Sequence, residues 1–173
     1  MQTKIQQSRL ANFAFGDMSL SPLWILIRLY VGYEWIIAGW GKIWSPVWVG
    51  PQAGVAVKGF LMGALSKTTG EHPDVSSWYA YFVQHFAINH TVMFSYLVAY
   101  GEVAIGITLI LGLLVGISSF FGMFMNLNYL FAGTVSINPQ LVVLEFLLIL
   151  AWRTAGDIGL DRFVLPKLFK KKK

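Results

Sequence analysis

One long apolar stretch constrains this chain more than any other feature. Residues 97–116, LVAYGEVAIGITLILGLLVG, contain a single carboxylate, Glu102, among apolar and small residues. As a helix rising ~1.5 Å per residue, such a stretch is about as long as the hydrocarbon core of a bilayer is thick. We therefore expect a membrane-spanning helix, in which Glu102 is a buried ionisable group that needs a structural or functional explanation.

The composition agrees with a membrane protein. Of the 173 residues, 56% are hydrophobic and 12% are charged, whereas soluble domains carry roughly 25% charged residues. The chain has no cysteine, which excludes disulfides, thiolate nucleophiles, iron–sulfur clusters and c-type haem attachment. Residues 1–21 contain no apolar segment, so we expect no cleavable signal peptide.

The apolar segments predict an all-α integral membrane four-helix bundle, formed by residues 1–173 as a single domain. We expect spans at about 22–41, 93–115, 117–136 and 139–156, with the later spans joined by connections short enough to make them antiparallel neighbours. Residues 44–92 are less apolar and predict an outward-facing cap of two amphipathic pieces, near Val55–Leu65 and Ser77–Ile88. The Gly112–Gly116 pair matches the GxxxG pattern, which we interpret as ordinary helix packing.

The distribution of basic residues predicts the orientation. The predicted side of the termini carries Lys4, Arg9, Arg162, Lys167 and Lys170–Lys173, and the opposite side carries Lys42, Lys58 and Lys67. We expect a multi-pass protein of the prokaryotic plasma membrane, and the positive-inside rule predicts that both of its termini are cytoplasmic. The net charge of +5 is explained by this distribution and does not indicate a nucleic-acid partner.

Several polar residues fall at membrane depth. Toward the cytoplasmic half we expect Arg28 and Arg153, near the midplane Glu34, Glu102, Asn126 and Asn128, and toward the outside Lys42 and Glu145. Each ionisable group at the bilayer centre costs at least ~2.5 kcal/mol unless it is paired or hydrated. We therefore expect these side chains to converge inside the bundle. A purely structural alternative pairs an arginine with a glutamate and uses the asparagines as interhelical hydrogen bonds.

Metal and haem sites are not expected. The three histidines, His72, His85 and His90, all lie in the predicted cap, so a bis-histidine haem inside the bundle is excluded. Glu71, His72 and His85 have poor spacing for a metal site, because a bound metal requires at least three well-placed ligands.

Short motifs along the chain resemble the DoxX/DoxD family of small four-helix membrane proteins. These are Arg28-x3-Gly32, Ala38–Lys42, Gly101-Glu102 and Ala155–Arg162, together with Pro46-x-Trp48 and Met125–Thr134, which are typical of the DoxD-type branch. The resemblance implies the large subunit of thiosulfate:quinone oxidoreductase, which couples two thiosulfates to tetrathionate and reduces a membrane quinone. A small DoxA-like subunit would be its partner.

With the predicted depths, this resemblance implies roles for eight residues. Glu34 and Glu102 would donate protons to quinone oxygens, Lys42 and Arg28 would attract the anion, Asn126 and Asn128 would hydrogen-bond substrate or quinone, and Trp35 and Trp40 would provide a packing surface. Quinone is then the electron acceptor, with no haem, iron–sulfur cluster or metal expected.

Two other functions stay open from the sequence. The chain could be a non-catalytic membrane scaffold that docks a soluble redox protein, or a small transporter or proton pathway that uses the same carboxylates as relays. A homo-oligomer formed through glycine-rich faces is also compatible with the sequence.

Overall fold

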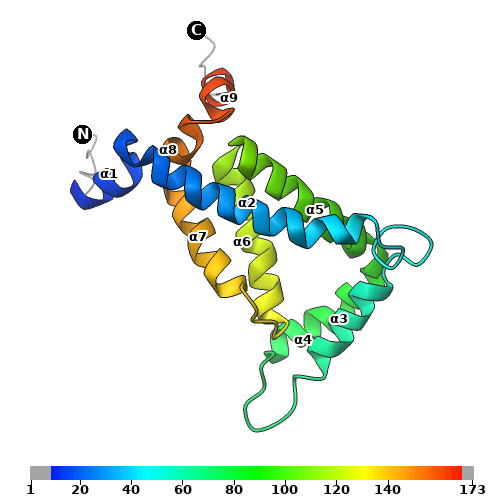
Figure 1. The fold of residues 1–173 in the computed structure, drawn as a ribbon. Helices are drawn as coiled ribbons and strands as arrows, with labels where there is room; N and C mark the ends of the chain where they lie inside the picture. The colour runs from blue at the N-terminus through cyan, green and yellow to red at the C-terminus, as the bar shows by residue number, and fades with distance from the viewer. Residues whose placement is uncertain (1–8, 169–173) are drawn as a thin grey trace.

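The computed structural model describes residues 9–168, which contain helices and no strand. The α-helices are α1 (Arg9–Gly16), α2 (Ser21–Ile43), α3 (Val55–Leu65), α4 (Ser77–His85), α5 (Thr91–Leu111), α6 (Val115–Phe131), α7 (Asn138–Leu150), α8 (Trp152–Asp157) and α9 (Asp161–Leu168). Two short 3-10 turns, η1 (Met18–Leu20) and η2 (Ala87–His90), precede α2 and α5. The helices α1 and α9 lie at one end of the molecule, and α3 and α4 lie at the other (Figure 1).

The bundle consists of α2, α5, α6 and α7, with α2 packed along α5 and α6 packed along α7. The first pair comes together at two glycines, because a Cβ on Gly106 would lie 2.7 Å from the backbone oxygen of Gly32. Glu102 and Gly106 both lie on the buried side of α5. The Glu102 carboxylate therefore lies where α5 packs against α2.

The interpretation of Gly112 and Gly116 as a helix-packing pair is wrong, because Gly112 lies in the turn between α5 and α6. Gly112 has φ +64° and ends α5 in the left-handed conformation, so it does not belong to a continuous helical GxxxG face. A Cβ at Gly112 would clash with the guanidinium of Arg28. The glycine is therefore required by a chain reversal and by an arginine packed directly on the backbone.

Asp161, at the start of α9, closes the same end of the bundle. Its carboxylate accepts hydrogen bonds from the backbone N–H groups of Leu114 (2.6 Å) and Val115 (2.9 Å), at the beginning of α6. An anionic acceptor at a helix N-terminus satisfies otherwise unpaired donors and interacts favourably with the helix dipole. The segment after α7 is thereby fixed to the α5–α6 turn.

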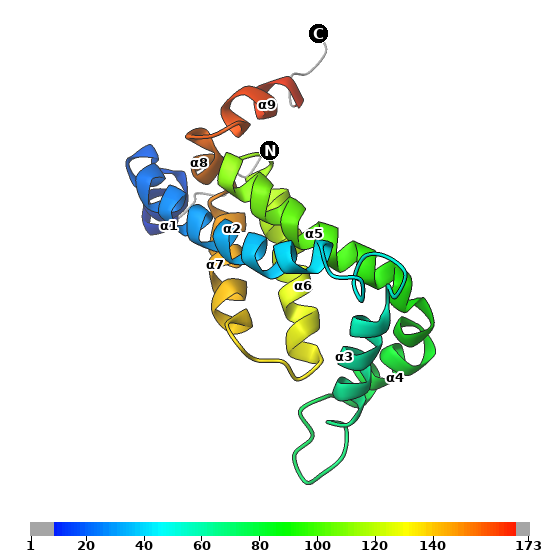
Figure 2. The same ribbon diagram turned by 45° about the vertical axis from the view of Figure 1, so that its right-hand side comes forward.

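The predicted cap contains helices at both of its amphipathic pieces. Helices α3 and α4 form at the two amphipathic pieces; they begin where α2 ends and α5 begins and lie beside the end of α6 (Figure 1, Figure 2). Side chains fasten the cap to the bundle: the Tyr79 hydroxyl donates to the Asn128 carbonyl oxygen (3.1 Å), and Lys67 Nζ donates to the Gly133 carbonyl oxygen (2.6 Å).

Helices occupy all four predicted spans, but their lengths differ from expectation. Within residues 9–168, Met18–Ile43 and Ala87–Leu111 are long and apolar enough to cross a membrane. Helix α6 has 17 residues and α7 has 13 before the helix is interrupted at Ala151, whereas a span needs about 20 apolar residues. The all-helical prediction is confirmed, and helix length supports the predicted membrane spans for the first two segments.

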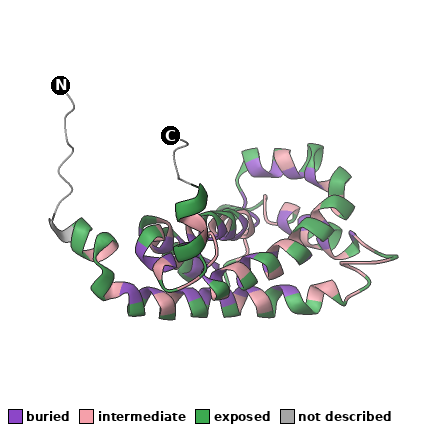
Figure 3. Cartoon of the chain, turned by 90° about the horizontal axis from the view of Figure 1, so that it is seen from above, coloured by how far each residue is buried: buried purple, intermediate pink, exposed green. Residues whose placement is uncertain are grey.

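Large apolar side chains cover the outside of the bundle helices. Figure 3 shows exposed residues along the outer faces of the helices and buried residues between them. Examples are Leu26 of α2, Ile117 and Phe120 of α6 and Phe146 of α7, each at least half exposed. Such extensive apolar exposure is rare on soluble monomers.

Candidate functional site

A cavity of about 510 Å³ lies where the bundle meets the cap. Its wall is built by α2 to α7, mainly from aromatic and aliphatic side chains such as Phe60, Phe82 and Phe94. The polar groups in this wall include carboxylates, amides, a tyrosine and a lysine. A largely apolar cavity with a few placed polar groups is the usual architecture of a small-molecule site.

Three side chains from three helices form a polar cluster in this wall. Lys42 Nζ lies 2.5 Å from Glu102 Oε2, and the Tyr129 hydroxyl donates to Glu102 Oε1 over 2.7 Å. The Glu102 side chain is 1% exposed and that of Lys42 is 22% exposed. Both carboxylate oxygens of Glu102 therefore have donors, and the pair is accessible from its lysine side.

Lys42 is held by further contacts. Its ammonium donates to the Ala38 carbonyl oxygen (2.9 Å) and lies 5.2 Å from the centre of the Trp48 ring. A cation over an indole face gains electrostatic stabilisation from the ring. These contacts hold the Lys42 ammonium at the cavity wall.

Glu34 contrasts with Glu102. Glu34 is half-buried on α2 and lines the cavity, and its carboxylate has no hydrogen bond or ion pair within residues 9–168. The two predicted carboxylates therefore share one cavity. One is fully engaged by protein donors, and the other is free to contact a ligand or water.

A second buried carboxylate cluster adjoins the cavity. Glu145 of α7 is fully buried; its Oε1 accepts from Trp35 Nε1 (2.6 Å) and its Oε2 accepts from Asn126 Nδ2 (2.8 Å). A Cβ at Gly122 would collide with Glu145 and lie 3.0 Å from Trp35 Nε1, so glycine provides the space for this contact. Trp35 and Asn126 also line the cavity.

The remaining predicted residues lie elsewhere or have local roles. Arg28 is near the opposite end of α2, where its guanidinium donates to the carbonyl oxygens of Ala155 (2.7 Å) and Ile158 (3.0 Å), and it does not line the cavity. Trp40 is 54% exposed and packs edge-on against Trp44, outside the cavity.

Asn128 does line the cavity, but its side-chain amide donates to the Phe124 carbonyl oxygen one turn earlier in α6 (2.8 Å). The structure therefore brings together Glu34, Trp35, Lys42, Glu102, Asn126 and Asn128 and leaves out Arg28 and Trp40.

Tyr129 and Glu145 are contributors that the sequence analysis did not assign to the site. Tyr129 is three residues from Asn126, which places it on the same face of α6. Glu145 was expected toward the outside, yet it bonds to two residues of the predicted site. The cost of a carboxylate in an apolar helix already placed Glu145 among the residues expected to converge inside the bundle, but it did not identify Trp35 and Asn126 as partners.

The cap contributes a tyrosine whose pKa is shifted. Burial raises the pKa of Tyr79 to about 12, since removal from water disfavours the phenolate. This hydroxyl is therefore a stable hydrogen-bond donor at neutral pH.

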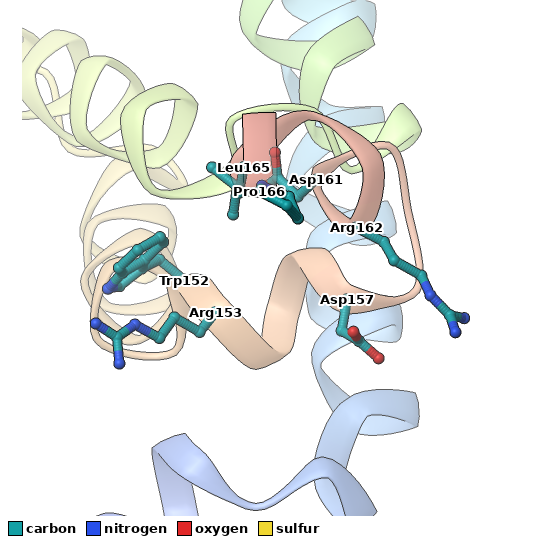
Figure 4. Close-up of a pocket in the computed structure, with 7 residues that line it drawn as sticks. All are labelled: Trp152, Arg153, Asp157, Asp161, Arg162, Leu165 and Pro166. Carbon is teal, nitrogen blue, oxygen red and sulfur yellow. The ribbon is translucent and has the colours of Figure 1, made fainter. Parts of the chain in front are cut away.

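A second, larger hollow of about 740 Å³ lies at the other end, between α8 and α9. Figure 4 shows Trp152 and Arg153 on one side of it and Asp157 and Arg162 on the other. None of its lining residues lines the first cavity, and its charged side chains are Arg153, Asp157, Asp161 and Arg162. Among residues 9–168 no group of three histidine, cysteine or acidic side chains is placed to hold a metal.

Comparison with known families identifies a family model that matches most of this chain. A family model described as "TQO small subunit DoxD" matches residues 23–173. No curated protein and no solved structure matches the sequence. The description specifies the small subunit, so the large-subunit assignment suggested by the motifs is not supported.

Proposed function

The chain belongs to the DoxD family, and from that premise we propose that it is the membrane subunit of a thiosulfate:quinone oxidoreductase that binds the quinone in the cavity between bundle and cap. The observation that carries this proposal is the free carboxylate of Glu34 facing the same cavity as the Glu102–Lys42–Tyr129 cluster. In this proposal the bundle is multi-pass, with both termini cytoplasmic and the cap outside.

The donor set and the wall suit a lipid-soluble quinone. A quinone ring is flat and apolar, with two carbonyl oxygens that accept hydrogen bonds. The ammonium of Lys42 has three N–H donors; two are bonded to Glu102 and to the Ala38 carbonyl oxygen, and the third can donate to a quinone oxygen. The phenylalanines of α3, α4 and α5 provide an apolar surface. The exposed apolar faces of the helices fit a lipid environment from which such a molecule enters.

The chemistry requires electrons and protons in equal number. Two thiosulfates give tetrathionate and release two electrons, and a quinone takes up two electrons and two protons to become a quinol. In our proposal Glu34 relays both protons in turn from water to the quinone, because its carboxyl group is not held by protein donors. Glu102 orients Lys42 and Tyr129, and Lys42 supplies the positive charge that favours anionic species near the cavity.

Arg28 has a different role in this proposal from the one expected from sequence. Its guanidinium donates to the carbonyl oxygens of Ala155 and Ile158 and so positions α2 against the C-terminal segment. Trp40 contacts lipid rather than the quinone.

Thiosulfate-dependent reduction of a quinone analogue in proteoliposomes, with the partner subunit present, tests the proposal. We expect Glu34→Gln and Tyr129→Phe to reduce the rate at least tenfold. Loss of a positioned acid typically costs about 10²–10⁴-fold, and Tyr129→Phe removes the donor that holds the Glu102 carboxylate beside Lys42. Glu71→Gln and Tyr100→Phe are matched controls on exposed positions outside the cavity. Full activity of both cavity variants would refute the proposal, and retained partner binding without quinone reduction by the wild type would favour a scaffold.

A further inference from the structure

The buried Glu145 has no role in the reaction proposed above, yet it is bonded to the cavity wall. It accepts one hydrogen bond from Trp35 and one from Asn126, and both of those residues line the cavity. The groups that face it from α2 and α6 are Trp35, Asn126 and Gly122, and none of them carries a charge.

The amide of Asn126 has two sides with opposite hydrogen-bonding character. Its Nδ2 is engaged by Glu145 at 2.8 Å, and its Oδ1 has no hydrogen bond within residues 9–168. An amide oxygen accepts and an amide nitrogen donates, although the two have nearly the same shape. Rotation of the amide by half a turn would exchange the two without moving the backbone.

The protonation state of Glu145 selects between these orientations. An ionised carboxylate only accepts, so it requires Nδ2 of Asn126, and Oδ1 is then left for the cavity. A protonated carboxyl group donates through its O–H, so it requires Oδ1, and Nδ2 is then left for the cavity. Trp35 remains bonded to the other oxygen, Oε1, in both states.

We propose that Glu145, acting through Asn126, makes the cavity discriminate between the oxidised and the reduced form of the quinone. Quinone carbonyl oxygens only accept, so they match the exposed Nδ2. Quinol hydroxyl groups donate, so they match the exposed Oδ1. Loss of the Glu145 proton therefore changes the cavity from one that favours quinone to one that favours quinol. This inference rests on the proposed function, because it assumes that the cavity binds a quinone.

The test measures the dissociation constants of decylubiquinone and its quinol for the full-length protein in detergent, without oxygen, by quenching of tryptophan fluorescence. For the wild type we expect the ratio of the quinone constant to the quinol constant to rise between acidic and alkaline pH. The change should be about tenfold, which corresponds to one hydrogen bond exchanged for one mismatch.

Glu145→Gln keeps an acceptor for Trp35 and presents a permanent NH₂ donor to Asn126. We expect this variant to hold the ratio at the wild type's acidic value at every pH. Asn126→Leu removes the amide and should also give a pH-independent ratio, so it tests the same idea if the first variant does not fold. Glu71→Gln, an exposed position in the α3–α4 loop, should behave like the wild type.

Three outcomes are distinguishable. A flat ratio in the two cavity variants with a pH-dependent ratio in the wild type and the control supports the inference. A ratio that changes with pH equally in all four proteins overturns it and leaves the proposed quinone site intact. Absence of binding of either form to the wild type overturns both the inference and the proposed function.

Discussion

The Lys42–Glu102 pair predicts an asymmetric response to its two single substitutions. Glu102 is 1% exposed and has a single other donor, Tyr129, whereas Lys42 is 22% exposed and keeps the Ala38 carbonyl and the Trp48 ring as partners. Removing one partner of a buried pair costs about 3–5 kcal/mol because the other charge is left uncompensated. The exposure of Lys42 allows water to reach the carboxylate, so we expect Lys42→Met to cost about 3 kcal/mol, near the lower limit of that range.

Glu102→Gln should be milder. The substituted amide retains the shape and an acceptor for Tyr129, so the expected loss is about 1 kcal/mol, the typical net value of a hydrogen bond. The double variant Lys42→Met/Glu102→Gln contains no uncompensated charge. We therefore expect it to lose about 2 kcal/mol rather than the sum of about 4 kcal/mol, which gives a coupling energy of about 2 kcal/mol.

The assay is reversible unfolding in mixed micelles titrated with sodium dodecyl sulfate and followed by circular dichroism. Lys58→Met is the control, since Lys58 is exposed on α3 and has no ion pair within the described residues. The reasoning is refuted if the double variant equals the sum of the single variants within about 0.5 kcal/mol, or if Lys42→Met costs no more than Lys58→Met.

Three further predictions concern stability. Gly122→Ala places a methyl group against the buried carboxylate of α7 and should lower the free energy of unfolding by about 1–3 kcal/mol, whereas Gly63→Ala, which has open space around it, should be neutral or stabilising by up to about 1 kcal/mol; equal effects in denaturant titration would contradict the packing described. Asp161→Ala leaves two N–H groups of α6 without their acceptor and should cost about 1–2 kcal/mol, while Asp157→Ala, measured the same way, should cost less; the reverse order would count against the capping role. The pKa of Tyr79 is raised from about 10 to about 12 by burial, so the unfolded chain releases this proton first and the free energy of unfolding should fall as pH rises between these values; Tyr79→Phe should show a smaller fall, and an unchanged profile would argue against the shift.

The positions of the helices follow from local sequence signals. Apolar periodicity and composition locate α2, α5 and the two cap helices, because these properties depend on neighbours along the chain. The interruption at Ala151 is different. It reflects tertiary contacts, since α8 supplies the Ala155 carbonyl that receives Arg28. A backbone carbonyl acceptor has no signature in sequence, so the partner of Arg28 could not be predicted from residue types.

The composition of the site was predictable in part. The cost of a charge at membrane depth predicts that Glu34, Glu102 and Lys42 lie together, and all three line one cavity. Helical phase already separates Trp40 from its buried neighbour Gly39, because successive residues differ by 100°, and the exposed position of Trp40 agrees with this. Tyr129 was not identified, because a tyrosine carries no charge and its free-energy cost in an apolar helix is small. The cost of a charged group at membrane depth therefore does not point to it.

Photolabelling tests the central claim most directly. An azidoquinone irradiated with the protein in liposomes, followed by mass spectrometry of the peptides, reports which segments touch the bound ring. We expect label on the cavity sides of α2 and α6, around Trp35–Lys42 and Phe124–Tyr129, and its loss when unlabelled quinone competes. Label confined to outward-facing residues such as Phe120 and Phe146, and unaffected by competition, would contradict a quinone site inside the cavity.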